Sequence, residues 1–329
     1  EGAEYTLGSA YVITPDPGGY LDNIYRDIGL HEVVRTDTDA APVEINGKIN
    51  PDIWAGMGVP PEDLPAYEAY RALVMRMANQ DYPDVPFPAQ WMRDLDRMPF
   101  KRHIEKEVGL PIPAPLAAAI QAYCYSSFAG GWEEISAASG WNFLAAEEFG
   151  RWIFPGGNAW MADAFWQRIR RTDETDPGHA PHLRPGCRVV DVRVHDSADP
   201  KSASTQVTWK TPEGEFRSLM ARRVVMAIPK HVCRYVIKDL ETLDPEKYNA
   251  SHLTTRSYVL ANVVLDREIP REIYDIFLLG NPETFPSNAG EAGSFWRFTD
   301  VLDGSYAPGP SQPGLPSRPS ILSLFWPLP

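Results

Sequence analysis

Cysteine is scarce in this 329-residue sequence, and the three cysteines present form no recognisable pattern. Cys124, Cys187 and Cys233 are widely spaced and make no CxxC motif, so a disulfide scaffold is not expected. One group of possible metal ligands, His179, His182 and Cys187, lies in a proline-containing loop without a fourth ligand nearby. We therefore expect that loop to be structural and predict no metal site.

Long apolar runs and an excess of basic residues are missing as well. No stretch of about 18 apolar residues occurs, so we expect no membrane-spanning helix. The formal net charge is −13, which argues against a nucleic-acid partner because such a protein needs a basic face to neutralise phosphates. The acidic balance suits a soluble protein and favours cationic small molecules through long-range attraction.

Signals for localisation and for common nucleotide chemistry are absent too. No signal peptide is visible and the chain begins at Glu1 without Met, so we expect a piece of a longer polypeptide and leave its compartment open. The sequence contains no G-x-S-x-G motif, no P-loop and no G-x-G-x-x-G fingerprint. A dinucleotide-binding turn of the usual type is therefore not encoded in these residues.

The residues that are abundant include 32 prolines and ten tryptophans. Pro308, Pro310, Pro313, Pro316 and Pro319 punctuate 307–329, where we expect an extended loop. Several tryptophans follow glycine, as in Gly131-Trp132 and Gly140-Trp141. Such aromatic residues suit either a core or an aromatic-lined pocket.

Hydrophobic periodicity predicts an α+β fold, with helices dominating up to about residue 170 and strands dominating after it. A hairpin is expected in 33–49, with its turn at Asn46-Gly47. Helices are expected at 21–28, 61–80, 90–97, 101–108, 115–127, 132–139, 143–151 and 159–171. Strands are expected at 5–13, 188–194, 205–210, 215–220, 223–227, 256–265, 295–298 and 321–326.

The region 154–229 is the most informative about function. Phe154-Pro-Gly-Gly-Asn158 opens a helix, and paired glycines at such a place let the backbone approach a ligand closely. A helix N-terminus also favours negative charge. Taken alone, this motif is more often an ordinary turn.

The order of the following elements makes this region more specific. A strand containing Val189-Val-Asp-Val192, a hairpin, and then Val224-Val-Met-Ala-Ile-Pro229 follow the glycine loop. This order resembles the flavin-containing amine oxidoreductase superfamily, which includes monoamine and polyamine oxidases and phytoene desaturases. Phe154–Asn158 together with Glu134-Ile-Ser-Ala137 is most similar to bacterial spermidine-dehydrogenase-like proteins.

The resemblance implies FAD as cofactor and a fold of two interleaved domains. Residues 1–19 and 150–245 would form a partial, doubly wound, Rossmann-like FAD-binding domain, and 20–149 and 246–329 a substrate domain of helices on a mixed sheet. The residues expected near FAD are Gly156, Gly157, Asn158, Val189, Ala227 and Pro229. The residues expected to line the substrate pocket are Trp132, Trp141, Leu260, Trp296 and Trp326.

The implied reaction is oxidation of a small amine, which could be a polyamine, by hydride transfer to flavin. Leu260 occupies the position where many oxidases of this superfamily carry a lysine beside the flavin, so we expect a dehydrogenase rather than an oxidase. We assign no catalytic residue. The absent fingerprint leads us to expect that the missing FAD-domain segments come from additional sequence or from another chain. A flavin enzyme acting on an apolar substrate and a cofactor-free binding module are the alternatives; acidic residues in the pocket would favour the amine.

Overall fold

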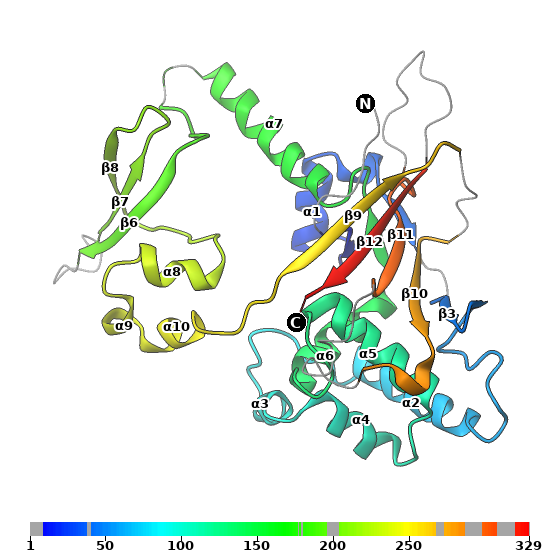
Figure 1. The fold of residues 1–329 in the computed structure, drawn as a ribbon. Helices are drawn as coiled ribbons and strands as arrows, with labels where there is room; N and C mark the ends of the chain where they lie inside the picture. The colour runs from blue at the N-terminus through cyan, green and yellow to red at the C-terminus, as the bar shows by residue number, and fades with distance from the viewer. Residues whose placement is uncertain are drawn as a thin grey trace. The chain divides into compact units, whose positions relative to one another are not determined.

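The computed structural model describes residues 9–37, 41–176, 178, 180–195, 204–267, 273–286, 298–307 and 320–328. The chain forms two compact units, Glu1–Arg168 with Arg256–Pro329, and Ile169–Thr255. These units are defined by packing, whereas the domains expected above are defined by what they bind, so that assignment stays a prediction. The expected α+β class is confirmed (Figure 1).

The larger unit is built on a six-stranded mixed sheet in the order β4-β3-β10-β11-β12-β9. Neighbouring strands are antiparallel except β3 and β10, which are parallel. A second sheet has the order β1-β5-β2. The strands of the first sheet are β3 Val43–Ile45, β4 Lys48–Asn50, β9 Tyr258–Val264, β10 Asp275–Gly280, β11 Asp300–Asp303 and β12 Ile321–Pro327; those of the second are β1 Tyr11–Ile13, β2 Arg35–Asp37 and β5 Arg151–Ile153.

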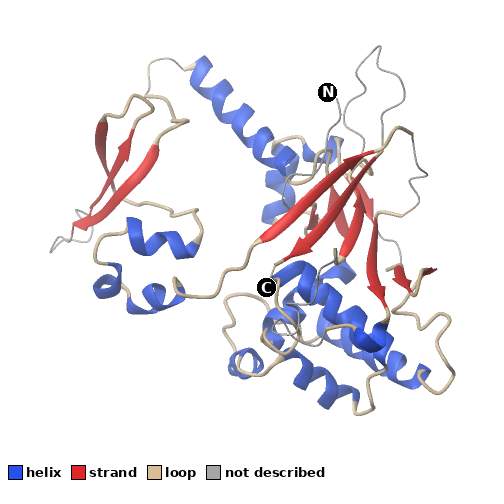
Figure 2. Cartoon of the chain, viewed as in Figure 1, coloured by secondary structure: helices blue, strands red, loops and turns tan. Residues whose placement is uncertain are grey.

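Helices α2 to α6 of the larger unit gather at one end of the strands, whereas α1 lies apart from them (Figures 1 and 2). Helix α5 is apolar around its whole circumference and almost wholly buried, as expected for a central helix. Its Tyr123 stacks on Phe277 of β10 with ring centroids 4.0 Å apart, which fixes α5 to the sheet. The helices are α1 Tyr20–Asp27, α2 Leu64–Asn79, α3 Gln90–Asp96, α4 Phe100–Val108, α5 Ala114–Phe128 and α6 Ala137–Leu144, with 3-10 turns at Leu30–Glu32, Ala146–Phe149 and Pro282–Thr284.

The sequence predicts helices at 132–139 and 143–151 with a break at Gly140, and the predicted break is wrong. The residue lies inside α6, and a Cβ atom placed on it would come within 2.5 Å of Phe100 Cγ. Here the glycine permits close contact between α6 and the ring of α4. A sequence pattern alone does not distinguish this use of glycine from helix breaking.

The prediction of a helix at 143–151 is also wrong. The helix α6 ends at Leu144, a 3-10 turn follows, and Gly150 has a φ of 83°. Arg151 then begins β5, the central strand of the small sheet. In the expected hairpin at 33–49, only β3 and β4 pair around Asn46-Gly47, while β2 joins the other sheet.

The smaller unit contains the antiparallel sheet β6-β7-β8 and three short helices. The strand predicted at 223–227 does not form. These residues have no ladder partner among the described residues, and Val225 is 89% exposed. The elements are β6 Arg188–His195, β7 Ser204–Lys210, β8 Phe216–Ala221, α8 Lys230–Val236, α9 Leu240–Leu243 and α10 Pro245–Ala250; α7 Ala159–Thr175 runs from the larger unit into the smaller one.

Two further expectations concern β-strands and membrane helices. The predicted strand at 295–298 falls mostly outside the described residues, and β10 was not anticipated. Among the helices that the structure describes, none combines the length and apolarity needed to cross a bilayer.

Candidate functional site

The larger unit contains a cavity of about 480 Å³ on one face of the six-stranded sheet, which we call the Leu260 cavity. Its walls come from β1, β9, β11, β12, the end of α5 and α6. The lining residues are Ser9, Ala10, Tyr11, Ser126, Ser127, Phe143, Tyr258, Leu260, Asp300, Leu302 and Phe325.

A continuous row of side chains across three strands forms the floor of this cavity. Leu260 of β9 is directly opposite Phe325 of β12, and Phe325 is opposite Asp300 of β11. Because side chains alternate between the faces of a strand, Tyr258 and Leu302 lie on the same face. The row therefore places one carboxyl group among aromatic and aliphatic neighbours.

Asp300 is the acidic residue of the Leu260 cavity, and only 4% of it is exposed. Burial, and then the negative charge of Asp275, raise the pKa of Asp300 to about 7, against the lowering effect of hydrogen bonds from Thr299 and Ser126 and of the charge on Arg151. Asp300 can thus be either a carboxylate or a neutral acid near neutral pH. Its charge would respond to a cation brought into the cavity.

The glycine loop expected to contact the cofactor lies beside this cavity. Gly156 and Gly157 both have left-handed backbones, with φ of 72° and 71°, which favours glycine at each position. The amide of Asn158 donates from its side chain to the carbonyl of Tyr11 at 2.8 Å, and Tyr11 lines the Leu260 cavity. The structure thereby brings the predicted cofactor loop and the predicted pocket residue Leu260 to one place.

This loop offers a partial fit for FAD. The Oδ1 atom of Asn158 is buried and has no hydrogen-bond partner among the residues that the structure describes, and such an atom calls for a donor. An N–H group of a flavin ring has that chemistry. The diphosphate end has no matching cradle in the sequence, since the glycine fingerprint is missing.

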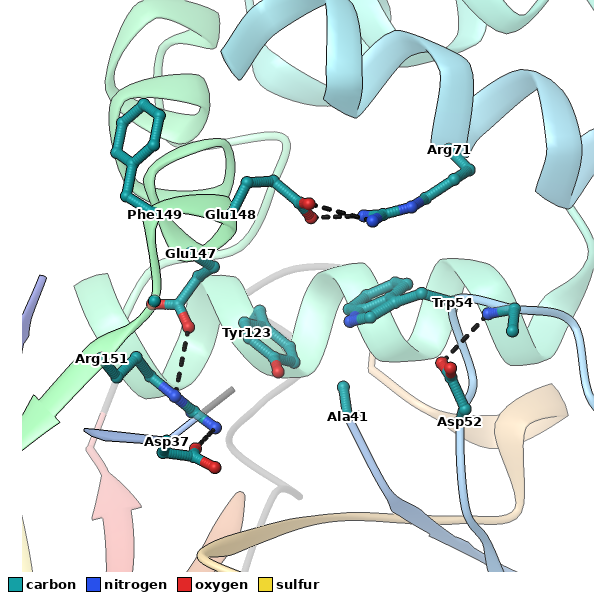
Figure 3. A pocket seen from close by; sticks show the side chains of 12 residues that line it. Asp37, Ala41, Asp52, Trp54, Arg71, Tyr123, Glu147, Glu148, Phe149 and Arg151 are labelled. Atoms are coloured by element: carbon teal, nitrogen blue, oxygen red, sulfur yellow. Dashed lines mark hydrogen bonds and ion pairs between the residues drawn. The ribbon is translucent and has the colours of Figure 1, made fainter. Parts of the chain in front are cut away.

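A second cavity of the same unit, of about 610 Å³, is lined by four carboxylates and two guanidinium groups; we call it the acidic cavity. In Figure 3 the rings of Trp54 and Tyr123 lie along one wall, with centroids 5.3 Å apart. No residue lines both cavities. The charged residues of the acidic cavity are Asp37, Asp52, Arg71, Glu147, Glu148 and Arg151.

Two sets of ion pairs organise the acidic cavity (Figure 3). Arg71 and Glu148 form a bidentate pair at the surface, with one N–O distance of 2.9 Å. Arg151 forms an ion pair with Asp37 and another, of 2.6 Å, with Asp275. Both arginines are therefore engaged, which leaves the other carboxylates of the cavity to attract cations.

Of the three carboxylates paired with Arg151, Glu147 lies farthest from the guanidinium group. Its Oε2 atom lies 3.7 Å from Arg151 Nε, while its Oε1 atom accepts a 2.9 Å hydrogen bond from the Tyr11 hydroxyl. Burial, aided by the charges of Asp275 and Asp37, raises the pKa of Glu147 to about 7, although Arg151 and the Tyr11 hydrogen bond oppose the shift.

Three of the four tryptophans predicted to line the pocket lie away from the Leu260 cavity. Trp132 and Trp141 are buried in the helical core, where the Trp141 indole donates to His103 Nδ1 at 2.9 Å. Trp326 follows Phe325 on β12 and so points to the opposite face of the sheet from the cavity. Trp296 lies outside the described residues.

The other cofactor candidates belong to the smaller unit. Val189 is on β6 opposite Trp209 and is 42% exposed. Ala227 lies in the extended segment, and Pro229 is the N-cap of α8. Their role in binding FAD stays a prediction. Of the metal ligands weighed above, His179 lies outside the described residues, and within the described parts no cluster suited to a metal occurs.

Comparison with known proteins adds information about the fold. The sequence matches no family model and no curated protein. A solved structure of wild-type putrescine oxidase bound to putrescine is similar, with a TM-score of 0.57 and 14% identity over 98% of this chain and 66% of that one. The chain has the fold of putrescine oxidase.

Two other solved structures agree with this assignment of the fold. A triple mutant of putrescine oxidase, made to redesign cofactor binding, gives a TM-score of 0.57 at 13% identity over 98% of this chain and 68% of that one. The PF1083 protein from Pyrococcus furiosus gives 0.52 at 12% identity over 93% and 63%. The chain thus spans about two thirds of the length of the putrescine oxidase structures.

Several site residues escaped the sequence analysis. Tyr11, Asp300 and Phe325 carry no motif, and Asp300 lies in β11, a strand that the sequence did not predict. The alternation of β12 is the one signal that pointed toward Phe325, because Ile321, Ser323 and Phe325 share a face. The ion-pairing residues around Arg151 come from separate elements, so no local sequence pattern predicts that they meet. They are Asp37 of β2, Glu147 of the 3-10 turn Ala146–Phe149, Arg151 of β5 and Asp275 of β10.

Proposed function

We propose that the protein is an FAD-dependent amine oxidoreductase whose substrate binds in the Leu260 cavity. The observation that carries the proposal is the buried carboxyl group of Asp300 on a floor that is otherwise aromatic and aliphatic. A carboxylate in such a place attracts an ammonium group. The similarity of the fold to that of putrescine oxidase also supports an amine as substrate.

In this proposal, Gly156, Gly157 and Asn158 hold the flavin end of the cofactor beside Tyr11. The flavin supplies the hydride acceptor. The diphosphate contacts come from residues not found in this sequence, on another segment or another chain.

The chain's own residues would bind and orient the amine. Asp300 pairs with the incoming ammonium group, while the rings of Tyr258 and Phe325 exclude water. Loss of water lowers the pKa of an amine, which favours the neutral form that can give up a hydride. The proton must then leave the ammonium nitrogen for a protein group.

We further propose a dehydrogenase acting on a diamine or polyamine. Leu260 stands where the oxidases that the sequence resembles carry a lysine, and it lines the cavity. The acidic cavity suits a second cationic group, because four carboxylates face two guanidinium groups there. The resemblance to spermidine-dehydrogenase-like proteins points the same way.

A flavin enzyme acting on an apolar substrate is the first alternative. Asp300 counts against it, because a buried carboxyl group weakens binding of a hydrocarbon. A cofactor-free binding module is the second alternative, and the absent glycine fingerprint favours it.

One experiment separates these functions. The protein is purified with any companion chain retained, its visible spectrum is recorded, and putrescine is added without oxygen. The proposal expects a flavin spectrum that bleaches with putrescine. Putrescine binding without any flavin would indicate the cofactor-free binding module. Bleaching of the flavin only by an apolar polyene would indicate the flavin enzyme that acts on an apolar substrate.

A further inference from the structure

We propose that Tyr11 and Glu147 form a proton path that leads from the Leu260 cavity to the acidic cavity. The path rests on the proposed function, since it removes the proton of the bound ammonium group. Tyr11 lines the first cavity and Glu147 lines the second. Their 2.9 Å hydrogen bond is the contact that joins the two.

Glu147 is the acceptor because its neighbours already satisfy the nearby positive charge. Arg151 is paired with Asp37 and Asp275, whereas its nearest approach to Glu147 is the 3.7 Å contact from Nε. Three carboxylates around one guanidinium repel one another, so a proton placed on one of them relieves that repulsion.

The exposure of the same side chains shows which of them can exchange that proton with water. The exposed fraction is 17% for the side chain of Glu147, against 0% for Asp37 and 7% for Asp275. The groups facing Glu147 are Tyr11 from β1, Asp37 from β2, Arg151 from β5 and Asp275 from β10. Burial, with the charges of Asp275 and Asp37, raises the tendency of Glu147 to take up a proton near neutral pH, while Arg151 and the Tyr11 hydrogen bond lower it.

The transfer balances without any change of oxidation state. The substrate ammonium gives one proton to the Tyr11 oxygen as the Tyr11 hydroxyl gives its own proton to Oε1 of Glu147. A neutral amine and a neutral Glu147 remain, and Glu147 then releases the proton to water in the acidic cavity. Asp300 lines the Leu260 cavity and not the acidic one, so it anchors the amine without providing this outlet.

The test is the rate of proton release after rapid mixing with putrescine, followed with a pH-indicator dye in weak buffer at pH 8. This readout needs no flavin turnover. Tyr11→Phe should slow the release by roughly a hundredfold, in the range of a lost proton-transfer group. Glu147→Gln should do the same. The phenyl ring of Tyr11→Phe keeps the packing beside Arg151, whose guanidinium carbon lies 5.2 Å from the ring centre.

Two matched controls remove similar groups that line neither cavity. Tyr82→Phe removes a hydroxyl that donates to the Asn142 carbonyl at 2.8 Å. Glu107→Gln removes a carboxylate that is paired with Arg76 at 2.7 Å and whose side chain is 23% exposed. Both variants should release the proton at the rate of the unchanged protein.

A second readout is the pH dependence of anaerobic flavin reduction in the holoenzyme, where the limb near pH 7 should disappear in Glu147→Gln. Putrescine binding with unchanged proton release in both Tyr11→Phe and Glu147→Gln would overturn the path alone. Slow release in Asp300→Asn but not in Tyr11→Phe would overturn it in favour of Asp300. An absence of putrescine binding by the unchanged protein would overturn the proposed function and the path together.

Discussion

The side-chain amide of Asn158 donates a 2.8 Å hydrogen bond to the backbone carbonyl of Tyr11. This contact joins a loop predicted to bind the cofactor to a strand in which the sequence analysis named no site residue. Because Tyr11 also lines the Leu260 cavity, the loop and the cavity form one structural region.

The first prediction is that Gly157→Val lowers the flavin content of the purified holoenzyme. A β-branched residue is strained at a φ of 71° and would also place side-chain atoms where the backbone should meet the cofactor. Gly109→Val is the control, since Gly109 has a φ of 67° and open space around it at the end of α4. Equal flavin occupancy in the two folded variants would contradict the assignment.

The second prediction is that the enzyme reacts slowly with oxygen and prefers a dye as electron acceptor. Leu260→Lys should increase peroxide formation, because it introduces the cation carried at this position by the oxidases that the sequence resembles. Val259→Lys places the same charge on the opposite face of β9 and should leave peroxide formation unchanged. Turnover is compared with oxygen and with an artificial dye; rapid peroxide production by the unchanged enzyme would show the dehydrogenase assignment to be wrong.

The third prediction concerns the charge of Asp300. Its pKa is raised to about 7, so the anionic form, and with it the affinity for putrescine, is lost as the pH falls through about 7. Asp300→Asn should weaken binding by roughly tenfold or more, the usual worth of a hydrogen bond to a charged group, and should remove this pH dependence.

Titration calorimetry between pH 6 and pH 9 checks this prediction. Asp303→Asn is the control, because Asp303 is a buried carboxylate of the same strand that binds Ser305 and does not line the Leu260 cavity. The same affinity and the same pH profile in Asp300→Asn and in the unchanged protein would rule out Asp300 as the amine's partner.

The fourth prediction is that Gly140→Ala destabilises the larger unit by roughly 1–3 kcal/mol, the usual cost of overpacking a core. The added methyl group would meet the Phe100 ring at 2.5 Å. Phe100→Leu makes room, so the double variant should lose less stability than the sum of the two single changes. Denaturant unfolding of the four proteins measures this coupling, and strict additivity would contradict the contact.

The fifth prediction is that these 329 residues alone bind FAD weakly. Without a glycine-rich turn and helix N-terminus, the charge of the diphosphate is left uncompensated. Flavin fluorescence during titration of the isolated chain reports the affinity. Tight, stoichiometric binding would show that the fingerprint is dispensable here.

The sequence predicted the elements whose patterns are local. The helices α2 to α5 and the strands β6 to β9 and β12 were placed within a few residues, because each carries its own apolar periodicity or turn signal. Leu260, whose strand was identified from the order of motifs around β9, lines a cavity, and its role in binding substrate stays a prediction. These predictions needed no knowledge of tertiary contacts.

The rest depended on contacts between distant segments. Glycine signals a break in local terms, yet at Gly140 it serves the approach of another helix. A run of apolar residues such as 223–227 signals a strand, yet a strand also requires a neighbour with free backbone groups. Only the tertiary fold brings together Asp37, Glu147, Arg151 and Asp275. Likewise, the sequence does not distinguish a tryptophan that packs in the core, such as Trp132 or Trp141, from one that lines a pocket.

Helix α5 contributes to both cavities, with Tyr123 at the acidic one and Ser126 and Ser127 at the Leu260 one. Its position is fixed by the stack of Tyr123 on Phe277. A mutation that shifts or rotates this helix therefore alters both pockets at once. Adaptation to a new substrate through α5 would be pleiotropic, and we expect divergence in specificity to proceed through β9, β11 and β12, which border the Leu260 cavity without bordering the other.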